Sequence, residues 1–328
     1  MNRSPLAIAT VATFALLTDV ALAQTTAQQQ KYPVRPIRII VATTAGSATD
    51  FTARMIGQRL TDAWGQQIVV DNRAGAGGVI AHELAANAAP DGYTLILSSS
   101  AGMVIGPLLN KVPYDTKRDF APISLAVINP NMLVSHPSLP VTNVNELVAL
   151  ARSKPGKLNC ASPGTGTANH LGCELLKNLA SVNFVHVPYK GTSPAINDLV
   201  GGQVDFMFNS MPGVLPLAKS GKLRALATAG KKRSSATPDL PTIAESIPGF
   251  DCINWYALFG PRGTPAAVVA KLNAEMVKMF GDAAFAQRFA EQGSEPQTTT
   301  PAELAKYVAS ESERWGKVIK AAGLQMQK

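Results

Sequence analysis

The chain has 328 residues, of which 46% are apolar and only 16% are charged, against about 25% charged residues in an average soluble domain. This composition excludes a disordered protein, and because no run of about 20 apolar residues lies in the body of the sequence, it also excludes a protein with several membrane spans. The net charge of +8 is scattered, and its densest run, Lys231-Lys232-Arg233, has no aromatic neighbours, so we expect no nucleic-acid partner. At roughly 150 residues per domain, the length suggests two domains.

The first 23 residues have the pattern of a secretory signal peptide. A positive start, Met1-Asn2-Arg3, precedes the apolar stretch Leu6 to Leu17, and Ala21-Leu22-Ala23 forms an A-x-A cleavage site. We therefore expect cleavage after Ala23 and a location in a bacterial periplasm. Because the next residue is Gln24 and not Cys, the sequence does not indicate a lipid anchor.

Two segments share one design, in which a buried strand leads through a loop of small residues into a helix. In the first, Ile37 to Ala42 predicts a strand buried on both faces, Thr43 to Thr49 a loop, and Asp50 the start of a helix. The inner face of this helix is expected to carry Phe51, Met55, Ile56 and Leu60. In the second, the corresponding parts are Leu158 to Ser162, Pro163 to Thr167, and a helix that begins at Ala168.

Strands and helices alternate around and between these two segments, which predicts an α/β fold with largely parallel sheets. Further strands are expected over Gln67–Asp71, Thr94–Ser98, Met132–Ser135, Asn183–Val187, Val204–Phe208 and Leu223–Ala229, and helices over Ile80–Ala88, Asn145–Arg152 and Ser193–Val200. The end of the chain predicts two more helices. The first is capped by Thr264 with Pro265 at the first helical position, and the second begins at a capping box from Thr300 to Glu303.

The three cysteines leave at least one thiol unpaired. Cys160 and Cys173 flank one loop and are able to pair, whereas Cys252 is remote in sequence, and we favour three buried, unpaired residues. The sequence has no C-x-x-C pair, so we expect no structural zinc site. His170 and Glu174 lie four residues apart, a spacing that favours a local side-chain contact over a metal site.

The common catalytic motifs are missing, including G-x-S-x-G, H-E-x-x-H and the phosphate-binding P-loop. The sequence instead predicts two helix N-termini, each after a loop rich in Gly, Ser and Thr. The first N–H groups of a helix have no partner within the helix, and the helix dipole is positive there, so an anion such as a carboxylate fits. Hydroxyl donors without a neighbouring base suit reversible binding better than catalysis. We expect no enzyme activity, no cofactor and no metal.

The order and spacing of several short motifs resemble the Bug family of periplasmic solute-binding proteins, the receptor components of tripartite tricarboxylate transporters. The motifs are Tyr32-Pro33, Pro36-Ile37-Arg38, the run from Val70 to Gly78, Ala89 to Leu95, Tyr114-Asp115, Asp119-Phe120, Pro122-Ile123, Ser162 to Thr167 with His170-Leu171, Val187 to Gly191, Asp198-Leu199, Gly202 to Asp205, Leu223 to Leu226 and Trp255-Tyr256. The resemblance covers essentially the whole mature chain.

The resemblance implies two α/β domains, each a mainly parallel sheet flanked by helices, joined by crossing strands and closing on a small carboxylate as a Venus flytrap does. The first domain is expected over residues 24–124 and 249–328, and the second over residues 125–248. The resemblance further implies delivery of the ligand to membrane permease subunits, and we expect a monomer.

The resemblance also implies a set of ligand-binding residues in four segments. They come from the loop Ala42–Thr49, the loop Ser162–Ala168, the segment after the strand Val204–Phe208 and a turn over Ser98–Ser100. The residues are Thr43, Thr44, Ala45, Gly46, Ser47, Ser98, Ser99, Ser162, Thr165, Gly166, Thr167, Ala168, Asn209 and Ser210.

The first loop departs from the family pattern, because Ala42, Thr43 and Ser47 replace a proline, an aromatic residue and a glycine. If no neighbour fills the space, the pocket is larger and suits an aromatic mono- or dicarboxylate; otherwise an aliphatic acid is expected. Two other functions stay open. One is a sensor that reports its ligand to a membrane kinase, and the other is a hydrolase with Ser162 or Ser47 as nucleophile and His170 as base, although no acidic residue is positioned to orient the base.

Overall fold

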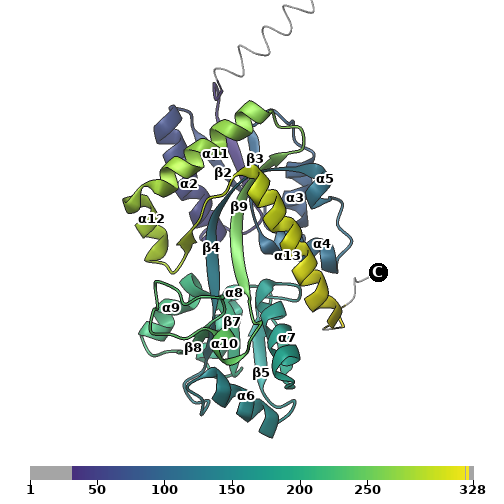
Figure 1. Ribbon diagram of the computed structural model, residues 1–328, viewed down its shortest axis with the longest axis vertical. Coiled ribbons are helices and arrows are strands. Elements are labelled where there is room, and N and C mark those ends of the chain that lie inside the picture. The colour runs from purple at the N-terminus through teal and green to yellow at the C-terminus, as the bar shows by residue number, and fades with distance from the viewer. Residues whose placement is uncertain (1–31, 322, 325–328) are drawn as a thin grey trace, which may run out of the picture.

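The computed structural model describes residues 32–321 and 323–324, so the expected signal peptide, residues 1–23, lies outside the described residues. The described chain forms two α/β lobes stacked along the long axis of the molecule, with two long strands running between them (Figure 1). None of the described helices is both long enough and apolar enough to span a bilayer.

The first lobe is built on three parallel strands, with β1 (Ile37–Val41) between β2 (Ile68–Asn72) and β3 (Thr94–Ser99). The four β-branched side chains of β1 are completely buried, which confirms the strand predicted from this apolar run. Its helical segments are α2 (Ala48–Trp64), η1 (Ala76–Gly78), α3 (Val79–Ala86), η2 (Ala101–Ile105), α4 (Gly106–Leu109) and α5 (Thr116–Asp119).

The second lobe repeats this plan, with β5 (Asn159–Ser162) between β6 (Val185–Pro188) and β7 (Phe206–Ser210), all parallel. A further strand, β8 (Arg224–Thr228), lies outside this trio. The helices of this lobe are α6 (Val144–Ser153), α7 (Ala168–Ala180), α8 (Thr192–Val200), α9 (Met211–Lys219) and α10 (Ile243–Ser246).

Two long strands, β4 (Phe120–Ser135) and β9 (Ile253–Pro261), cross between the lobes and pair with each other in antiparallel fashion. β9 pairs with β3 in the first lobe, while β4 pairs with β7 and β8 in the second, so one mixed sheet runs through both lobes. This arrangement confirms the expected two-domain α/β fold with crossing strands. The domain boundaries after residues 124 and 248 stay a prediction, and the first of them falls within β4.

Three helices from the end of the chain complete the fold. α11 (Ala266–Gly281) and α12 (Ala283–Ala290) pack on the first lobe, and after β10 (Glu295–Pro296), α13 (Pro301–Ala321) runs down one side of the molecule and contacts α4 and α7 (Figure 1). The capping box before α13 is confirmed, because the Glu303 N–H donates to Thr300 Oγ1 at 3.2 Å and the Thr300 N–H to Glu303 Oε2 at 2.8 Å. Thr264 does not cap α11 as predicted; its hydroxyl donates to the Pro261 carbonyl, and Pro265 is the cap residue.

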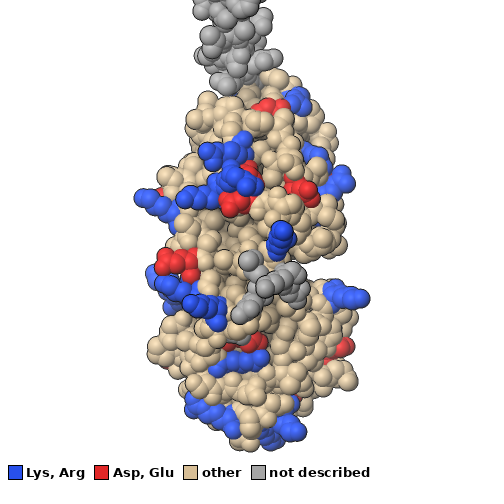
Figure 2. Space-filling model, turned by 90° about the vertical axis from the view of Figure 1, so that its right-hand side faces the viewer, with Lys and Arg blue, Asp and Glu red and all other residues tan. Residues whose placement is uncertain are grey.

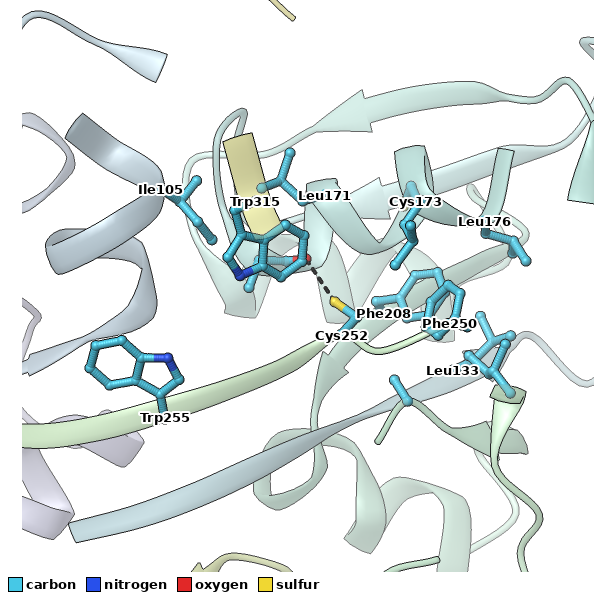
Figure 3. Close-up of a cluster of buried hydrophobic side chains, with 14 of the residues drawn as sticks. Ile105, Leu133, Leu171, Cys173, Leu176, Phe208, Phe250, Cys252, Trp255 and Trp315 are labelled. Atoms are coloured by element: carbon cyan, nitrogen blue, oxygen red, sulfur yellow. Dashed lines mark hydrogen bonds between the residues drawn. The ribbon is translucent and has the colours of Figure 1, made fainter. Parts of the chain in front are cut away.

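The largest hydrophobic core runs through both lobes on one side of the sheet. It joins α13 to α7 and to the start of β9 through completely buried residues such as Trp255, Trp315, Leu171 and Phe208 (Figure 3). A second core lies under α2, α11 and α12, and a third lies under α8 and α9. The expected inner face of α2 is only partly buried, since Ile56 and Leu60 are inaccessible whereas Phe51 rests half-buried on Phe289 of α12.

The expectation of three unpaired cysteines is wrong, because Cys160 and Cys173 form a disulfide. Cys160 lies on β5 and Cys173 on α7, and packing of this helix on its strand brings the two Cα atoms to 6.5 Å. The thiol of Cys252 is free, fully buried and donates to the Ala168 carbonyl at 3.1 Å. Burial raises the pKa of Cys252 to about 12, so this thiol stays protonated.

Candidate functional site

The carboxyl ends of the parallel strands in the two lobes point toward one another. β3 ends at Ser99, which pairs with Tyr256 of β9, and Tyr256 in turn pairs with Val127 of β4. β7 runs the opposite way along β4 and ends at Ser210, which pairs with Asn131. The two ends are thus separated along β4 by four residues, roughly 13 Å at about 3.3 Å per residue. In α/β folds the crevice at the carboxyl ends of the strands is the usual ligand site.

The loop between β1 and α2, which we call loop 1 (residues 42–47), is held by a buried carboxylate. Asp50 Oδ2 accepts hydrogen bonds from the Gly46 N–H at 2.9 Å and from Arg54 Nε at 3.0 Å. Asn72 Nδ2 donates to Asp50 Oδ1 at 3.0 Å and to the Thr43 carbonyl at 3.1 Å. Burial raises the pKa of Asp50, but the bonds from Arg54, Gly46 and Asn72 outweigh it and hold this pKa below its ordinary value.

Helix α2 begins two residues earlier than predicted, with Ser47 as its cap. Ser47 Oγ accepts from the Asp50 N–H at 3.2 Å and lies 2.6 Å from Thr43 Oγ1. Of the predicted binding residues in loop 1, Thr44, Ala45 and Gly46 are exposed, and Thr43 and Ser47 are partly exposed.

The glycine-rich segment η1 fills the space beside Ala42. Gly78 has a φ of +92°, and a Cβ atom on it would lie 3.2 Å from the Ala42 side chain. The gap expected from the loss of the family's proline is therefore closed by backbone. Extra room for a ligand is therefore expected only beside the partly exposed Thr43, which replaces the family's aromatic residue.

The loop between β5 and α7, which we call loop 2 (residues 163–167), is closed by its own side chains. α7 begins at Ala168 as predicted, and Thr167 is its cap: Thr167 Oγ1 accepts from the His170 N–H at 3.2 Å and donates to the Gly164 carbonyl at 2.8 Å. The Gly166 N–H donates to His170 Nδ1 at 3.1 Å. Thr165 is exposed, whereas Ala168 is buried.

Loop 2 also contacts the first lobe. Gly166 has a φ of +80°, and a Cβ atom on it would lie 3.0 Å from a methyl carbon of Leu109 in α4. A side chain at this position would therefore press against the opposite lobe. Loop 2 thus lies between the lobes, as the predicted ligand-binding role requires.

A pair of stacked imidazoles lies beneath loop 2. The rings of His170 and His186 have centroids 3.9 Å apart, and His186 Nε2 lies 2.7 Å from Ser162 Oγ. Burial and then the charge of Lys177 lower the pKa of His170 to about 4, while burial and then His170 lower the pKa of His186 to about 4. Both rings are therefore neutral at pH 7.

These contacts do not form the catalytic pair of the hydrolase hypothesis. The histidine next to Ser162 is His186 and not His170, and Ser162 itself is completely buried. His170 Nδ1 accepts a hydrogen bond from the Gly166 N–H. Its Nε2 lies 3.8 Å from Glu174 Oε1, which is the local contact that the four-residue spacing predicted.

The expected turn over Ser98–Ser100 is not a turn, because Ser98 and Ser99 end β3 and Ser100 leads into η2. Ser98 is buried, and its hydroxyl lies 2.6 Å from His82 Nε2, so it points into the first lobe. In the second lobe Asn209 is buried with its Oδ1 accepting the Ser210 N–H at 2.7 Å, and Ser210 is partly exposed.

The two helix starts differ in charge. The first turn of α2 contains Asp50, whose carboxylate already occupies the Gly46 N–H. The first turn of α7 contains no acidic residue. The Gly166 N–H is likewise occupied, by His170 Nδ1, so the difference between the two starts is one of charge. Since an anion is repelled by a nearby carboxylate, the start of α7 is the better candidate for an anion site.

A groove of 610 Å³ lies elsewhere, between the starts of α11 and α13. Its lining is mostly alanine and proline, and the two polar side chains in it are already bonded. Asn273 donates to the carbonyls of Ile123 and Thr299, and Thr264 donates to Pro261. The groove therefore offers no spare side-chain donor to a carboxylate.

Several residues at the site were not predicted from the sequence. Asn72 reaches loop 1 from β2, Leu109 reaches loop 2 from α4, and His186 reaches Ser162 because β5 pairs with β6. Each depends on a contact between distant segments, which no local pattern reveals. Among the described residues, no group of three or more His, Cys, Asp or Glu side chains is arranged to hold a metal ion.

Two α/β lobes on a pair of crossing strands, with loops from both lobes facing the region between them, define a two-lobed solute-binding protein. Comparison with known sequences gives the family. The family model described as "Tripartite tricarboxylate transporter family receptor" matches residues 52–324, and the chain belongs to this family.

The chain is similar over most of its length to two curated proteins. It is 39% identical over 311 residues to the UPF0065 protein in the tcbD-tcbE intergenic region of Pseudomonas sp. strain P51, covering 93% of each chain. It is 38% identical over 301 residues to protein BugT of Bordetella pertussis, covering 90% of this chain and 92% of BugT. These matches confirm the resemblance to the Bug family.

Solved structures of similar sequence share the fold. The Rpa4515 protein of R. palustris with adipate has a TM-score of 0.84 and 36% identity, covering 89% of this chain and 98% of its own. The periplasmic binding protein BugD has a TM-score of 0.80 and 36% identity, covering 90% and 100%. MatC (Rpa3494) from Rhodopseudomonas palustris with bound malate has a TM-score of 0.79 and 34% identity, covering 88% and 100%.

Proposed function

We propose that this protein is a receptor that captures one small carboxylate between its two lobes and delivers it to the membrane permease of a tripartite tricarboxylate transporter. The observation that carries the proposal is the start of α7, which faces the first lobe at Leu109 and has no acidic residue in its first turn. The ligand carboxylate binds there, at the exposed Thr165 and the first N–H groups of the helix.

Loop 1 supplies uncharged donors to the same ligand. Its partly exposed hydroxyls, Thr43 and Ser47, and the exposed backbone of Thr44 and Ala45 face the ligand from the first lobe. Because Asp50 already binds the Gly46 N–H, contacts from loop 1 go through hydroxyls and the remaining amides. The hinge motion brings loop 1 and loop 2 together by bending β4 and β9, as in other two-lobed receptors.

The ligand class that we favour is a dicarboxylate. Two structural relatives have adipate and malate bound, and both of these are aliphatic dicarboxylates. The backbone of Gly78 fills the space beside Ala42, which supports an aliphatic acid of similar size, while the room beside Thr43 keeps an aromatic acid as the alternative. Binding without turnover is proposed, since Ser162 is buried and its histidine partner lies beneath the loop.

The proposed place of action is the periplasm. The pattern over residues 1–23 supports secretion with cleavage after Ala23, and the family to which the chain belongs consists of transport receptors. We propose that the mature chain works as a monomer and that its ligand-bound form binds the permease. An intact mass of the secreted protein would test the cleavage site, because the mature chain is expected to begin at Gln24.

A thermal-shift screen tests the function directly. The mature protein is heated with mono- and dicarboxylates of three to ten carbons, including benzoate and phthalate. A ligand present at 100 times its dissociation constant adds about 2.7 kcal/mol of stability, which raises the melting temperature by several degrees at roughly 2–4 °C per kcal/mol. The proposal predicts such a shift for at least one dicarboxylate, and a panel without any shift would reject it.

A further inference from the structure

Asn254 on the crossing strand β9 lies where the two lobes meet and has no assigned role. We propose that its side-chain amide hydrogen-bonds the end of the ligand remote from the anchored carboxylate and so selects acids with a second acceptor group. This inference rests on the proposed function, because it assigns the second half of the same binding site.

The position of Asn254 follows from the strand register. β3 accompanies β9 only as far as Ser99, which pairs with Tyr256, so Asn254 lies two residues beyond the end of β3. On the other side Asn254 pairs with Asn129 of β4, and β7 joins β4 only from Asn131 onward. Asn254 therefore occupies the stretch of crossing strand between the ends of β3 and β7, the stretch that a ligand held between loop 1 and loop 2 would lie against.

The hydrogen bonds of Asn254 fix which end of its amide is available. Its Oδ1 accepts from the Trp255 N–H at 3.0 Å and from the Ser100 hydroxyl at 2.7 Å. A backbone N–H can only donate, so the atom facing it is the oxygen, and the amide cannot be turned around. Its Nδ2 bonds to none of the described residues, and the side chain is partly exposed. Asn254 thus presents two N–H donors and needs an acceptor.

The neighbours of Asn254 lie near the start of α2, which follows loop 1. Tyr256 is two residues along β9 and shares its face of the sheet, and its buried phenol lies near Thr49, in the first turn of α2. Asn129, directly opposite, is completely buried, and its Nδ2 also lacks a partner among the described residues. The crossing strands therefore place neutral amide groups next to the start of α2.

This arrangement predicts selectivity from the cost of an unpaired donor. An acid whose far end is a carboxylate or carbonyl oxygen satisfies the Asn254 amide in the closed protein. An acid of the same length with a methyl end buries the amide without a partner, and a buried donor without a partner is unfavourable. A dicarboxylate should thus bind more tightly than the monocarboxylate of equal length.

Calorimetric titration of two matched pairs of acids tests the proposal. The pairs are adipate with hexanoate and succinate with butyrate, and the proteins are the mature wild type, Asn254→Leu, Asn254→Asp and Ser100→Ala. We expect the wild type to bind the better dicarboxylate at least tenfold more tightly than its monocarboxylate. Asn254→Leu should remove that ratio by weakening the dicarboxylate at least tenfold while leaving the monocarboxylate within threefold.

The other two variants separate this role from a structural one. Asn254→Asp keeps the acceptor for Trp255 and Ser100 but replaces the donor by a negative oxygen, so it should also weaken the dicarboxylate at least tenfold even if the leucine variant does not fold. Ser100→Ala removes one of the two donors to Asn254 Oδ1 but keeps the Trp255 contact and the amide donors, so it should weaken the dicarboxylate much less than Asn254→Asp does.

The outcomes distinguish this inference from the proposed function. If the wild type binds both members of a pair equally, or if Asn254→Asp binds the dicarboxylate as tightly as the wild type, the assignment of Asn254 is overturned while carboxylate capture stands. If the wild type binds neither adipate nor succinate, the titrations are made with the dicarboxylate that gives the largest thermal shift and its matched monocarboxylate; if no dicarboxylate of the panel binds, the dicarboxylate function and the role of Asn254 both fail.

Discussion

At the scale of single residues, the two predicted helix starts carry different chemistry. Ser47 caps α2 and Thr167 caps α7. The sequence pattern correctly predicted that α7 begins at Ala168, directly after Thr167. What the pattern could not predict is that Asp50 folds back on Gly46 with help from Asn72 of another strand. That contact places a carboxylate at the start of α2, and it is the reason why we propose the start of α7, which has no acidic residue, as the anion site.

The stacked pair His170 and His186 gives the protein a dependence on pH, to which His82, whose pKa is also lowered by burial, adds. The pKa values of His170 and His186 are lowered to about 4 in the folded protein, against about 6.5 in an unfolded chain. Between pH 6.5 and 4 the unfolded chain therefore binds more protons, so the stability is complete above pH 6.5 and falls as the pH decreases through this window. Each histidine contributes at most about 1.4 kcal/mol per pH unit.

We expect His186→Gln to make this decline less steep by about one proton, because one of the two stacked histidines is gone. Urea denaturation at a series of pH values between 4 and 7 measures the slope. The control is His136→Gln, at a ring that contacts Ser138 and not the stacked pair. This variant should lose stability toward low pH as steeply as the wild type does. An unchanged slope in His186→Gln would show that the stacked rings do not govern acid stability.

At the scale of elements, the strand–loop–helix units were predicted well and the crossing strands poorly. The apolar β-branched run makes β1 recognisable from sequence alone, and the loop of small residues before Ala168 does the same for the start of α7. β4 was predicted only over Met132–Ser135, because Pro122 and Pro130 interrupt the run before it and proline usually argues against a strand. Both prolines are tolerated within the long pairing with β9, whose register shifts beside Pro122.

The disulfide ties β5 to α7 around loop 2 and should stabilise this unit. Closing a loop of this length stabilises a fold by roughly 3 kcal/mol, so Cys160→Ala with Cys173→Ala should lower the melting temperature by roughly 6–12 °C. Scanning calorimetry with and without dithiothreitol measures the effect. Reductant should bring the wild type to the melting temperature of the double variant and leave that variant unchanged.

Cys252→Ala serves as the control, since this free thiol forms no disulfide; it donates to the Ala168 carbonyl and accepts from Asn131 Nδ2. It should keep the sensitivity to reductant that the disulfide gives. If the reductant releases the free thiols of the wild type but leaves its melting temperature unchanged, the disulfide has no stabilising role.

At the scale of the whole molecule, a single continuous sheet runs through both lobes, and the lobes face each other along its length. The resemblance to a receptor family predicted this arrangement, and motif order was sufficient because the motifs mark strand ends and helix starts in both lobes. The register of β4 and β9 could not be predicted, and it decides that β3 and β7 end four residues apart and that Asn254 lies between them. Charged side chains are scattered over the face shown in Figure 2, as the sequence composition led us to expect.

The most direct test of carboxylate capture between the lobes is a crystal structure of the mature protein with the tightest-binding acid of the thermal-shift panel. We predict one acid molecule between loop 1 and loop 2, with one carboxylate at the first turn of α7 near Thr165 and its far end within hydrogen-bonding distance of Asn254. An acid found instead in the groove between α11 and α13, or on the outer surface with the lobes unchanged, would contradict the account.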